Sequence, residues 1–129
     1  MDVKAINDNY EKIDGFDYEN GIIIDSISKD EVVAHVDGNS KLYNPWNIIH
    51  GGLLFGLADT AIGVLCYANG GKGVTVDAHI NYLKQCKEYV KAVATPIKIG
   101  KTVSVYKADI FNEKDELAAT LTMNYYNMK

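Results

Sequence analysis

The segment from Gly52 to about Tyr67 constrains the fold most, because it has the spacing of a helix and almost no polar face. A helix that is apolar on nearly all sides must be enclosed by the rest of its protein. We therefore predict one central, buried helix in this region. The glycine-rich run 69–73 follows at once and predicts where the helix ends.

The rest of the chain predicts short strands separated by turns. Two apolar, β-branched segments, 21–27 and 31–36, predict a hairpin before the helix. The turn-rich residues 37–49 predict a long loop. After the helix, alternation and spacing predict an antiparallel meander of four strands, at 74–83, 89–99, 102–111 and 116–126.

These elements define an α+β architecture in which one long helix is wrapped by a curved antiparallel sheet. A length of 129 residues suits a single domain, so we predict one domain over 1–129, with a short helix within 1–15. The first residues have no apolar core or cleavage pattern, and the apolar run 51–58 is too short to span a bilayer. The expected location is therefore the cytoplasm, without membrane contact.

Composition argues against several classes of partner. The net charge is −4 and every one of the 13 basic residues is a lysine, whereas proteins that follow phosphates on nucleic acid normally present arginines on a basic surface. No nucleic-acid partner is expected. The two cysteines and three histidines show no metal-site spacing, so no metal is expected, and Cys66 in the apolar run is interpreted as a small core residue.

Two glycines, Gly51 and Gly52, begin the predicted helix. The first N–H groups of a helix have no partner inside it, and the helix dipole favours negative charge there. A carbonyl oxygen placed at this end would be stabilised as it gains charge, which is the arrangement of an oxyanion hole. The alternative is that the glycines only permit a tight turn from loop to helix.

Asp59 lies in the middle of the same helix among apolar residues, where an unpaired carboxylate is unfavourable. One interpretation is a hydrogen bond to Thr60, to Thr75 or to a backbone N–H. The other is a carboxylate that acts as a base or nucleophile in a partly dry pocket.

Gly51 and Asp59 are eight positions apart, so about 12 Å separates them along one helix axis. They cannot both touch one small reacting carbonyl. If both act, they come from different chains, and two antiparallel helices about a twofold axis would form two equivalent sites. A catalytic interpretation therefore predicts a homodimer.

Two neighbouring polar residues have open interpretations. His50 is either a helix cap or surface residue, or a group that binds a leaving group or orders the loop together with Asn44. Thr75 begins a strand whose alternation would place Asp77, His79 and Asn81 on the same face. That face is either turned to solvent or turned to the site.

Three segments together resemble the PaaI-type hotdog-fold acyl-CoA thioesterases, over about residues 20–126. They are Asn44-x5-His50-Gly51-Gly52-x6-Asp59, Gly73-Val74-Thr75-Val76-Asp77 and Gly100-Lys101-Thr102. The resemblance agrees with the predicted single helix and curved sheet. It implies hydrolysis of acyl-CoA without a metal or organic cofactor, coenzyme A being part of the substrate. It also implies a homodimer that commonly pairs again into a tetramer.

The resemblance implies a role for each catalytic candidate. The backbone N–H of Gly51 would polarise the thioester carbonyl, and Asp59 of the partner subunit would activate water or attack directly. Asn44 and His50 would position water or support the departing thiolate. Thr75 would lie beside the carboxylate.

The resemblance also implies substrate contacts. Lys101, in the turn formed with Gly100 and Thr102, would lie near the coenzyme A phosphates. Trp46 and His79 depart from what relatives carry at these positions, and we assign them, with Gly52 at the helix start, to substrate binding. The competing hypothesis is a non-catalytic hotdog domain that binds acyl-CoA or lipid, against which the buried carboxylate argues. A hotdog dehydratase ranks last.

Overall fold

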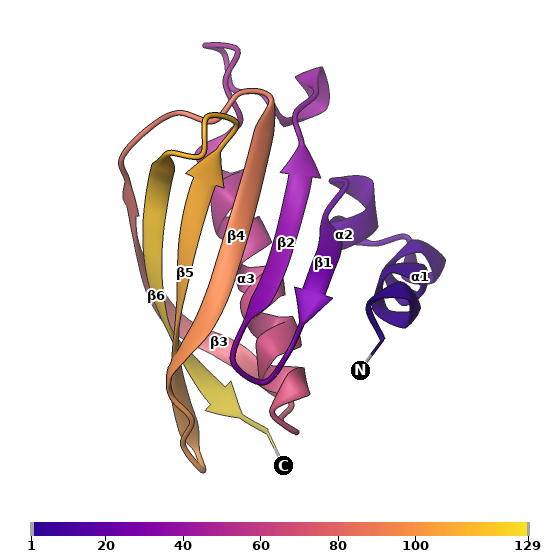
Figure 1. Cartoon of the computed structure of the whole chain (residues 1–129), viewed down its shortest axis with the longest axis vertical. Coiled ribbons are helices and arrows are strands. Elements are labelled where there is room, and N and C mark those ends of the chain that lie inside the picture. Colours follow the sequence, from indigo (N-terminus) through magenta and orange to yellow (C-terminus); the bar gives the residue numbers. More distant parts are fainter. Residues whose placement is uncertain (1, 129) are drawn as a thin grey trace.

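A computed structural model describes residues 2–128. Along the chain the elements are α1 (Val3–Ile13), α2 (Phe16–Glu19), β1 (Ile23–Ile27), β2 (Val32–Asp37), the 3-10 helix η1 (Ser40–Leu42), α3 (Gly51–Ala68), β3 (Gly73–Tyr82), β4 (Tyr89–Lys98), β5 (Val103–Asn112) and β6 (Leu117–Asn127). The six strands form one antiparallel sheet that curves around α3, and α1 and α2 lie beside β1 (Figure 1). The predicted α+β class, with one central helix in a curved sheet, is confirmed.

The central helix α3 is confirmed at Gly51–Ala68, and it ends at Asn69, followed by Gly70 with a positive φ of 80°. The sheet covers its apolar side, where nine residues are buried: Leu53, Leu54, Leu57, Ala58, Ala61, Ile62, Val64, Leu65 and Cys66. One stripe stays at least partly exposed, so this chain alone does not enclose the helix completely. The stripe contains Gly52, Asp59, Gly63 and Tyr67.

The helix is longer than the apolar run 51–58 that the sequence emphasised. At 18 residues and a mean hydropathy of 1.5, α3 is long and apolar enough to cross a membrane by those two measures, and half of it is buried inside the fold. The sequence-based expectation that this segment is too short to span a bilayer was therefore wrong about its length. It counted only residues 51–58, whereas the helix continues through Asp59 to Ala68.

The strand order is β1-β2-β4-β5-β6-β3, so the predicted four-strand meander is wrong for β3. Only β4, β5 and β6 form a meander, and β3 pairs with β6 instead of β4. The reason is α3, which intervenes between β2 and β3 and packs across the inner face of the sheet. The chain therefore leaves the sheet at β2 and returns at the opposite edge as β3.

A β-bulge in β3 corrects the predicted faces of that strand. Thr75 pairs with Tyr125 and Asp77 pairs with Asn124, so the register skips Val76. The extra residue reverses the alternation. Thr75 consequently faces α3 with Ala78, whereas Asp77 is on the outer face of the sheet.

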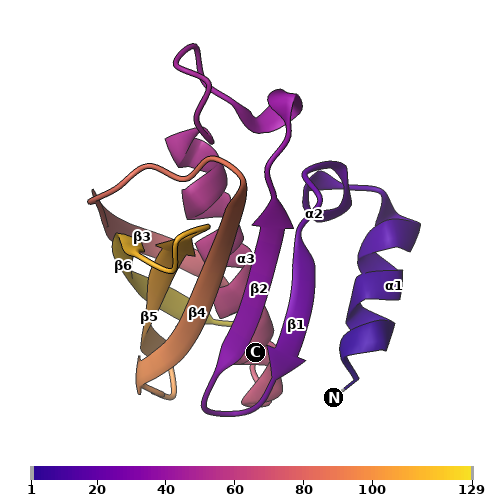
Figure 2. The same cartoon turned by 45° about the horizontal axis from the view of Figure 1, so that its top comes forward.

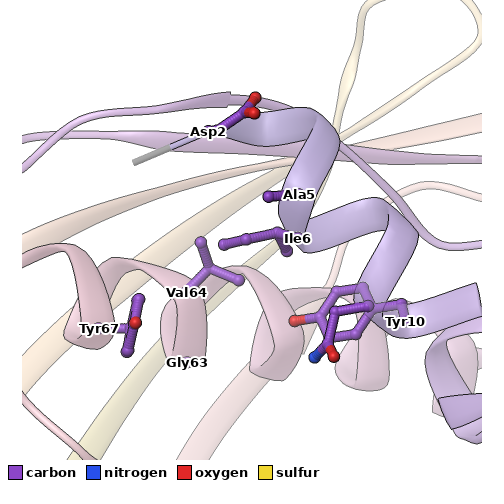
Figure 3. A pocket seen from close by; sticks show the side chains of 8 residues that line it. Asp2, Ala5, Ile6, Tyr10, Gly63, Val64 and Tyr67 are labelled. Carbon is purple, nitrogen blue, oxygen red and sulfur yellow. The ribbon is translucent and has the colours of Figure 1, made fainter. Parts of the chain in front are cut away.

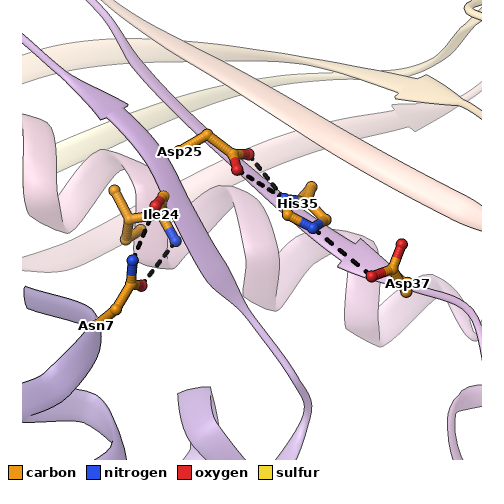
Figure 4. Close-up of polar contacts among 5 residues, drawn as sticks. All are labelled: Asn7, Ile24, Asp25, His35 and Asp37. Atoms are coloured by element: carbon orange, nitrogen blue, oxygen red, sulfur yellow. Dashed lines mark hydrogen bonds and ion pairs between the residues drawn. The ribbon is translucent and has the colours of Figure 1, made fainter. Parts of the chain in front are cut away.

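The N-terminal helix predicted within 1–15 is confirmed as α1, while α2 and η1 were not predicted. The side chain of Asn7 holds α1 against the sheet, because its amide donates to the Ile24 carbonyl and its oxygen accepts from the Ile24 N–H, both at 2.9 Å (Figure 4). On the outer face of the sheet, His35 Nδ1 lies 2.8 Å from Asp25 (Figure 4).

Candidate active site

His50 is the cap of α3, as one of its two interpretations proposed. Its Nδ1 accepts a hydrogen bond from the Gly52 N–H at 2.8 Å. An Nδ1 that accepts carries no proton, so the proton of the neutral ring is on Nε2. Within residues 2–128 the Gly51 N–H donates to no acceptor. Of the two glycine donors at this helix end, only that of Gly51 is therefore available to a ligand.

Tyr82 from β3 covers the first residue of α3. Its hydroxyl donates to the Gly51 carbonyl at 2.8 Å. A Cβ on Gly51 would lie 3.2 Å from the Tyr82 ring, which is tighter than an ordinary contact, so the close approach depends on glycine. Sequence reasoning considered Tyr82 as a strand residue that could line the acyl pocket. It did not predict the contact with Gly51, which depends on where β3 enters the sheet.

Asp59 is held by Thr75, which was one of the three partners considered from the sequence. The Thr75 hydroxyl donates to Asp59 Oδ1 at 2.6 Å, and both residues are half-buried. Thr60 donates instead to Asp17 at 2.5 Å. The bulge in β3 makes this contact possible, because without it Thr75 would face away from α3.

Tyr125 of β6 lies behind this pair as the cross-strand partner of Thr75. It is 7% exposed, and a Cβ on Gly63 of α3 would lie 3.3 Å from its hydroxyl. Burial, and then the charge of Asp59, raise the pKa of Tyr125 to about 12, so its hydroxyl stays neutral. Only the strand register places Tyr125 here, and no sequence motif marks it.

Asn44 and Trp46 belong to the loop between β2 and α3, which projects beyond the sheet (Figure 2). Asn44 stabilises the loop itself, because its side-chain oxygen accepts from the Trp46 N–H at 2.9 Å and its N–H donates to the Ile48 carbonyl at 2.8 Å. Trp46 is 78% exposed. Neither residue contacts Asp59 within this chain.

The turn of Gly100, Lys101 and Thr102 joins β4 to β5 and lies near the C-terminal end of α3, where Gly100 and Cys66 line one cavity of about 250 Å³. A Cβ on Gly100 would lie 2.0 Å from the Val103 carbonyl oxygen, so this turn requires glycine. Lys101 is exposed. An 18-residue helix is about 27 Å long, so this turn and Gly51 are at opposite ends of the protomer.

His79 is on the outer face of β3, where its Nε2 lies 3.2 Å from Asn81 Oδ1. The structure thus brings together Asp59 and Thr75 at mid-helix, and His50, Gly51 and Gly52 at the helix start. It leaves the remaining candidates outside both groups. No group of three or more metal-binding side chains occurs within 2–128.

Comparisons with known proteins agree with this geometry. The family model of the thioesterase superfamily matches residues 47–119. The chain is 32% identical over 100 residues to the acyl-coenzyme A thioesterase PaaI of Escherichia coli, which covers 74% of this chain and 71% of that protein. A solved thioesterase from Haemophilus influenzae has a TM-score of 0.90 at 25% identity, covering 100% of this chain and 92% of that chain.

A hypothetical thioesterase protein from Streptococcus pneumoniae was solved with coenzyme A. It has a TM-score of 0.79 at 27% identity and covers 83% of this chain and 88% of that chain. The same protein was solved with an aspartate, and separately with a threonine, replaced by alanine. Those two positions are sixteen residues apart, which is also the separation of Asp59 and Thr75.

A curved antiparallel sheet around a single central helix, with a half-buried carboxylate at mid-helix, is the arrangement of a hotdog-fold enzyme of the PaaI type. The chain belongs to the thioesterase superfamily, and it is a PaaI-like enzyme that hydrolyses thioesters.

Proposed function

We propose that this enzyme hydrolyses acyl-CoA to a free acid and coenzyme A, in a site to which the Gly51 N–H of one protomer and Asp59 of the partner subunit both contribute. One observation carries the proposal. The unpaired Gly51 N–H and the Thr75-held Asp59 are on the same helix, about 12 Å apart, so a single chain cannot apply both to one carbonyl carbon.

The reaction needs only these two groups. Asp59 takes a proton from water while the water oxygen bonds to the thioester carbon, or the carboxylate itself attacks and water later cleaves the resulting anhydride. The carbonyl electrons move to oxygen, where the Gly51 N–H stabilises the charge by about 3 kcal/mol. Collapse then breaks the C–S bond and releases the thiolate. The proposal includes no metal or organic cofactor.

Thr75 acts as a positioning residue, and His50 acts at the leaving group. The Thr75 hydroxyl donates to one Asp59 oxygen, which leaves the other oxygen free to receive a proton or attack. His50 occupies the Gly52 N–H with its Nδ1, which leaves its Nε2 proton to donate to the departing thiolate or to an ordered water. Asn44 holds the loop that leads into this helix end.

The homodimer is supported by the edge of the sheet. β3 is an edge strand of ten residues, with Val74 49% and Val76 63% exposed. A long, apolar edge is a template for pairing with another chain. A twofold axis beside β3 would bring two α3 helices together antiparallel and cover the exposed stripe that contains Asp59 and Gly63. Pairing of two such dimers is part of the proposal by family resemblance.

Coenzyme A would extend toward the Lys101 turn, whose ammonium group can pair with phosphate as a point charge. This turn lies near the C-terminal end of the helix that carries Asp59. The relative solved with coenzyme A supports the substrate class. Trp46, His79 and Gly52 stay predicted contacts to the substrate, although the Gly52 N–H is already bonded to His50 within the chain.

The first experiment changes Asp59→Asn and measures thiol release from a panel of acyl-CoAs. Loss of the base should lower kcat/KM by about 10²–10⁴-fold, with the melting temperature nearly unchanged because Asn can still accept from Thr75. Asp30→Asn, in the exposed β1–β2 turn, is the matched control. Full activity of the Asp59 variant would contradict the proposal, and binding without turnover by the wild type would instead favour a binding domain.

A further inference from the structure

A groove of about 650 Å³ lies between α1 and α3. Ala5, Ile6 and Tyr10 form its wall on α1, and Val64 and Tyr67 form most of its wall on α3 (Figure 3). None of these residues belongs to the two groups described above. A groove of this size on the helix that carries the candidate acid is well suited to hold part of a ligand.

The walls of the groove are fixed rather than loosely apposed. Asn7 holds α1 to β1 through its two hydrogen bonds with Ile24 (Figure 4). Ile6 and Tyr10 pack against the buried core. The Tyr10 hydroxyl stays neutral, because burial, and then the nearby charge of Asp17, raise its pKa to about 12.

Gly63 brings the groove close to Asp59. This residue lines the groove and follows Asp59 by one helical turn, about 6 Å along the axis. It has no side chain to separate the two regions, and the Tyr125 hydroxyl lies directly beneath it. Figure 3 shows Tyr10 at one end of the groove and Asp2 with Tyr67 at the other. The Tyr10 end is the end nearer to Asp59.

The side chains that line the groove indicate which part of an acyl-CoA molecule could bind there. The lining contains aliphatic and aromatic side chains, the neutral amide of Asn9, no basic residue, and one carboxylate, Asp2, at the far end. The phosphate-bearing end of coenzyme A is therefore a poor ligand for this groove, because no basic side chain lines it. An uncharged, apolar acyl group does fit, whereas an acyl group ending in a carboxylate would face Asp2 without a compensating charge.

We propose that this groove is the acyl subsite, and that α1 sets a preference for neutral medium-chain or aryl acyl groups. The inference rests on the proposed function and names its substrate class. On the α1 side the lining runs from Asp2, the N-cap of α1, to Tyr10, about 12 Å of helix, which is close to the length of an extended medium-chain acyl group. Each methylene that enters should improve kcat/KM about fourfold, which corresponds to ~0.8 kcal/mol.

The test fills the groove without touching the catalytic groups. Ala5→Phe places a ring in the half remote from Asp59, and Glu11→Phe, at an exposed α1 position outside the groove, is the matched control. We expect Ala5→Phe to lower the ratio of kcat/KM for octanoyl-CoA over acetyl-CoA at least tenfold, with acetyl-CoA turnover within twofold of wild type. The control should leave the ratio unchanged.

A second comparison uses substrates of equal length. The wild type should hydrolyse hexanoyl-CoA at least ten times faster than adipoyl-CoA, and Asp2→Asn should narrow that gap. Binding of S-octyl-coenzyme A, a thioether that cannot be hydrolysed, gives a readout independent of turnover. Its affinity should exceed that of coenzyme A in the wild type and lose most of this excess in Ala5→Phe.

The outcomes separate this inference from the proposed mechanism. An octanoyl preference and S-octyl-coenzyme A affinity that survive Ala5→Phe would overturn the acyl subsite, whatever Asp59→Asn does. An active Asp59→Asn enzyme that still loses its octanoyl preference through Ala5→Phe would overturn the assignment of the base and support the subsite.

Discussion

At the scale of single residues, two adjacent N–H groups at the start of α3 differ in whether they have a hydrogen-bond partner within the chain. His50 satisfies the N–H of Gly52, and the N–H of Gly51 is left for a ligand. Asp59 is similarly half-satisfied, because Thr75 donates to one of its two oxygens. In both places a local hydrogen bond fixes the geometry and leaves one neighbouring polar atom available for chemistry.

Gly51→Pro tests the donor directly. Gly51 is the first helical residue, where proline is well tolerated, and His50, with a ψ of 136°, already has the conformation preferred before proline. The substitution therefore removes the N–H while keeping the helix start, although it also adds a Cβ against Tyr82, and kcat should fall about 10²–10³-fold. Gly51→Ala is the control, because it keeps the N–H and adds the same Cβ against Tyr82. Equal losses of activity in both variants would show that crowding, not the donor, matters.

At the scale of elements, β3 determines where the site is assembled. Its position at the sheet edge places Tyr82 over the helix start, and its bulge turns Thr75 toward Asp59. The same edge exposes apolar side chains to a second chain. One strand thus organises both the residues within the protomer and the surface through which, in our proposal, two protomers meet.

Val76→Lys tests this edge. A lysine on an exposed edge strand opposes pairing with another strand, so the variant should sediment as a monomer and lose at least about 10²-fold in kcat/KM. Ile23→Lys, on the other edge strand β1 and 42% exposed, is the matched control and should stay a dimer with ordinary activity. A fully active Val76→Lys monomer would refute a site shared between subunits.

At the scale of the whole molecule, the helix that carries both groups also keeps them apart. A rigid α3 holds Gly51 and Asp59 at a fixed separation, so no motion within one protomer brings them to the same atom. A symmetric dimer could bring the Gly51 of one protomer to the Asp59 of the other. An isologous dimer repeats every contact, so it would form two identical sites.

Mixing two inactive variants tests that arrangement. If subunits of Asp59→Asn and Gly51→Pro are dissociated and reassembled in equal amounts, half of the dimers are mixed, and each mixed dimer contains one intact site. The mixture should recover about a quarter of the wild-type activity, although each variant alone is inactive. No recovery, with mixed dimers demonstrated by mass spectrometry, would place both groups in the same protomer.

Local patterns predicted most of the elements. The apolar run of α3, the glycines after it and the alternation of the later strands depend on residues close together in the chain, so these elements were predicted within a few positions. The isolated carboxylate of Asp59 was likewise recognisable from the sequence, because an acid among apolar residues needs a partner or a role. α2 is only one turn long and offered no such periodicity.

The sequence by itself therefore determined the central helix, its glycine-rich start and its embedded acid, since helical periodicity and capping are local properties of the chain. Only the tertiary structure decided that β3 joins β6, that a bulge directs Thr75 to Asp59, that Tyr125 lies beneath Gly63 and that α1 leaves a groove beside α3. These features depend on packing between segments distant in the chain, and a one-residue change of register is enough to reverse which face a side chain occupies.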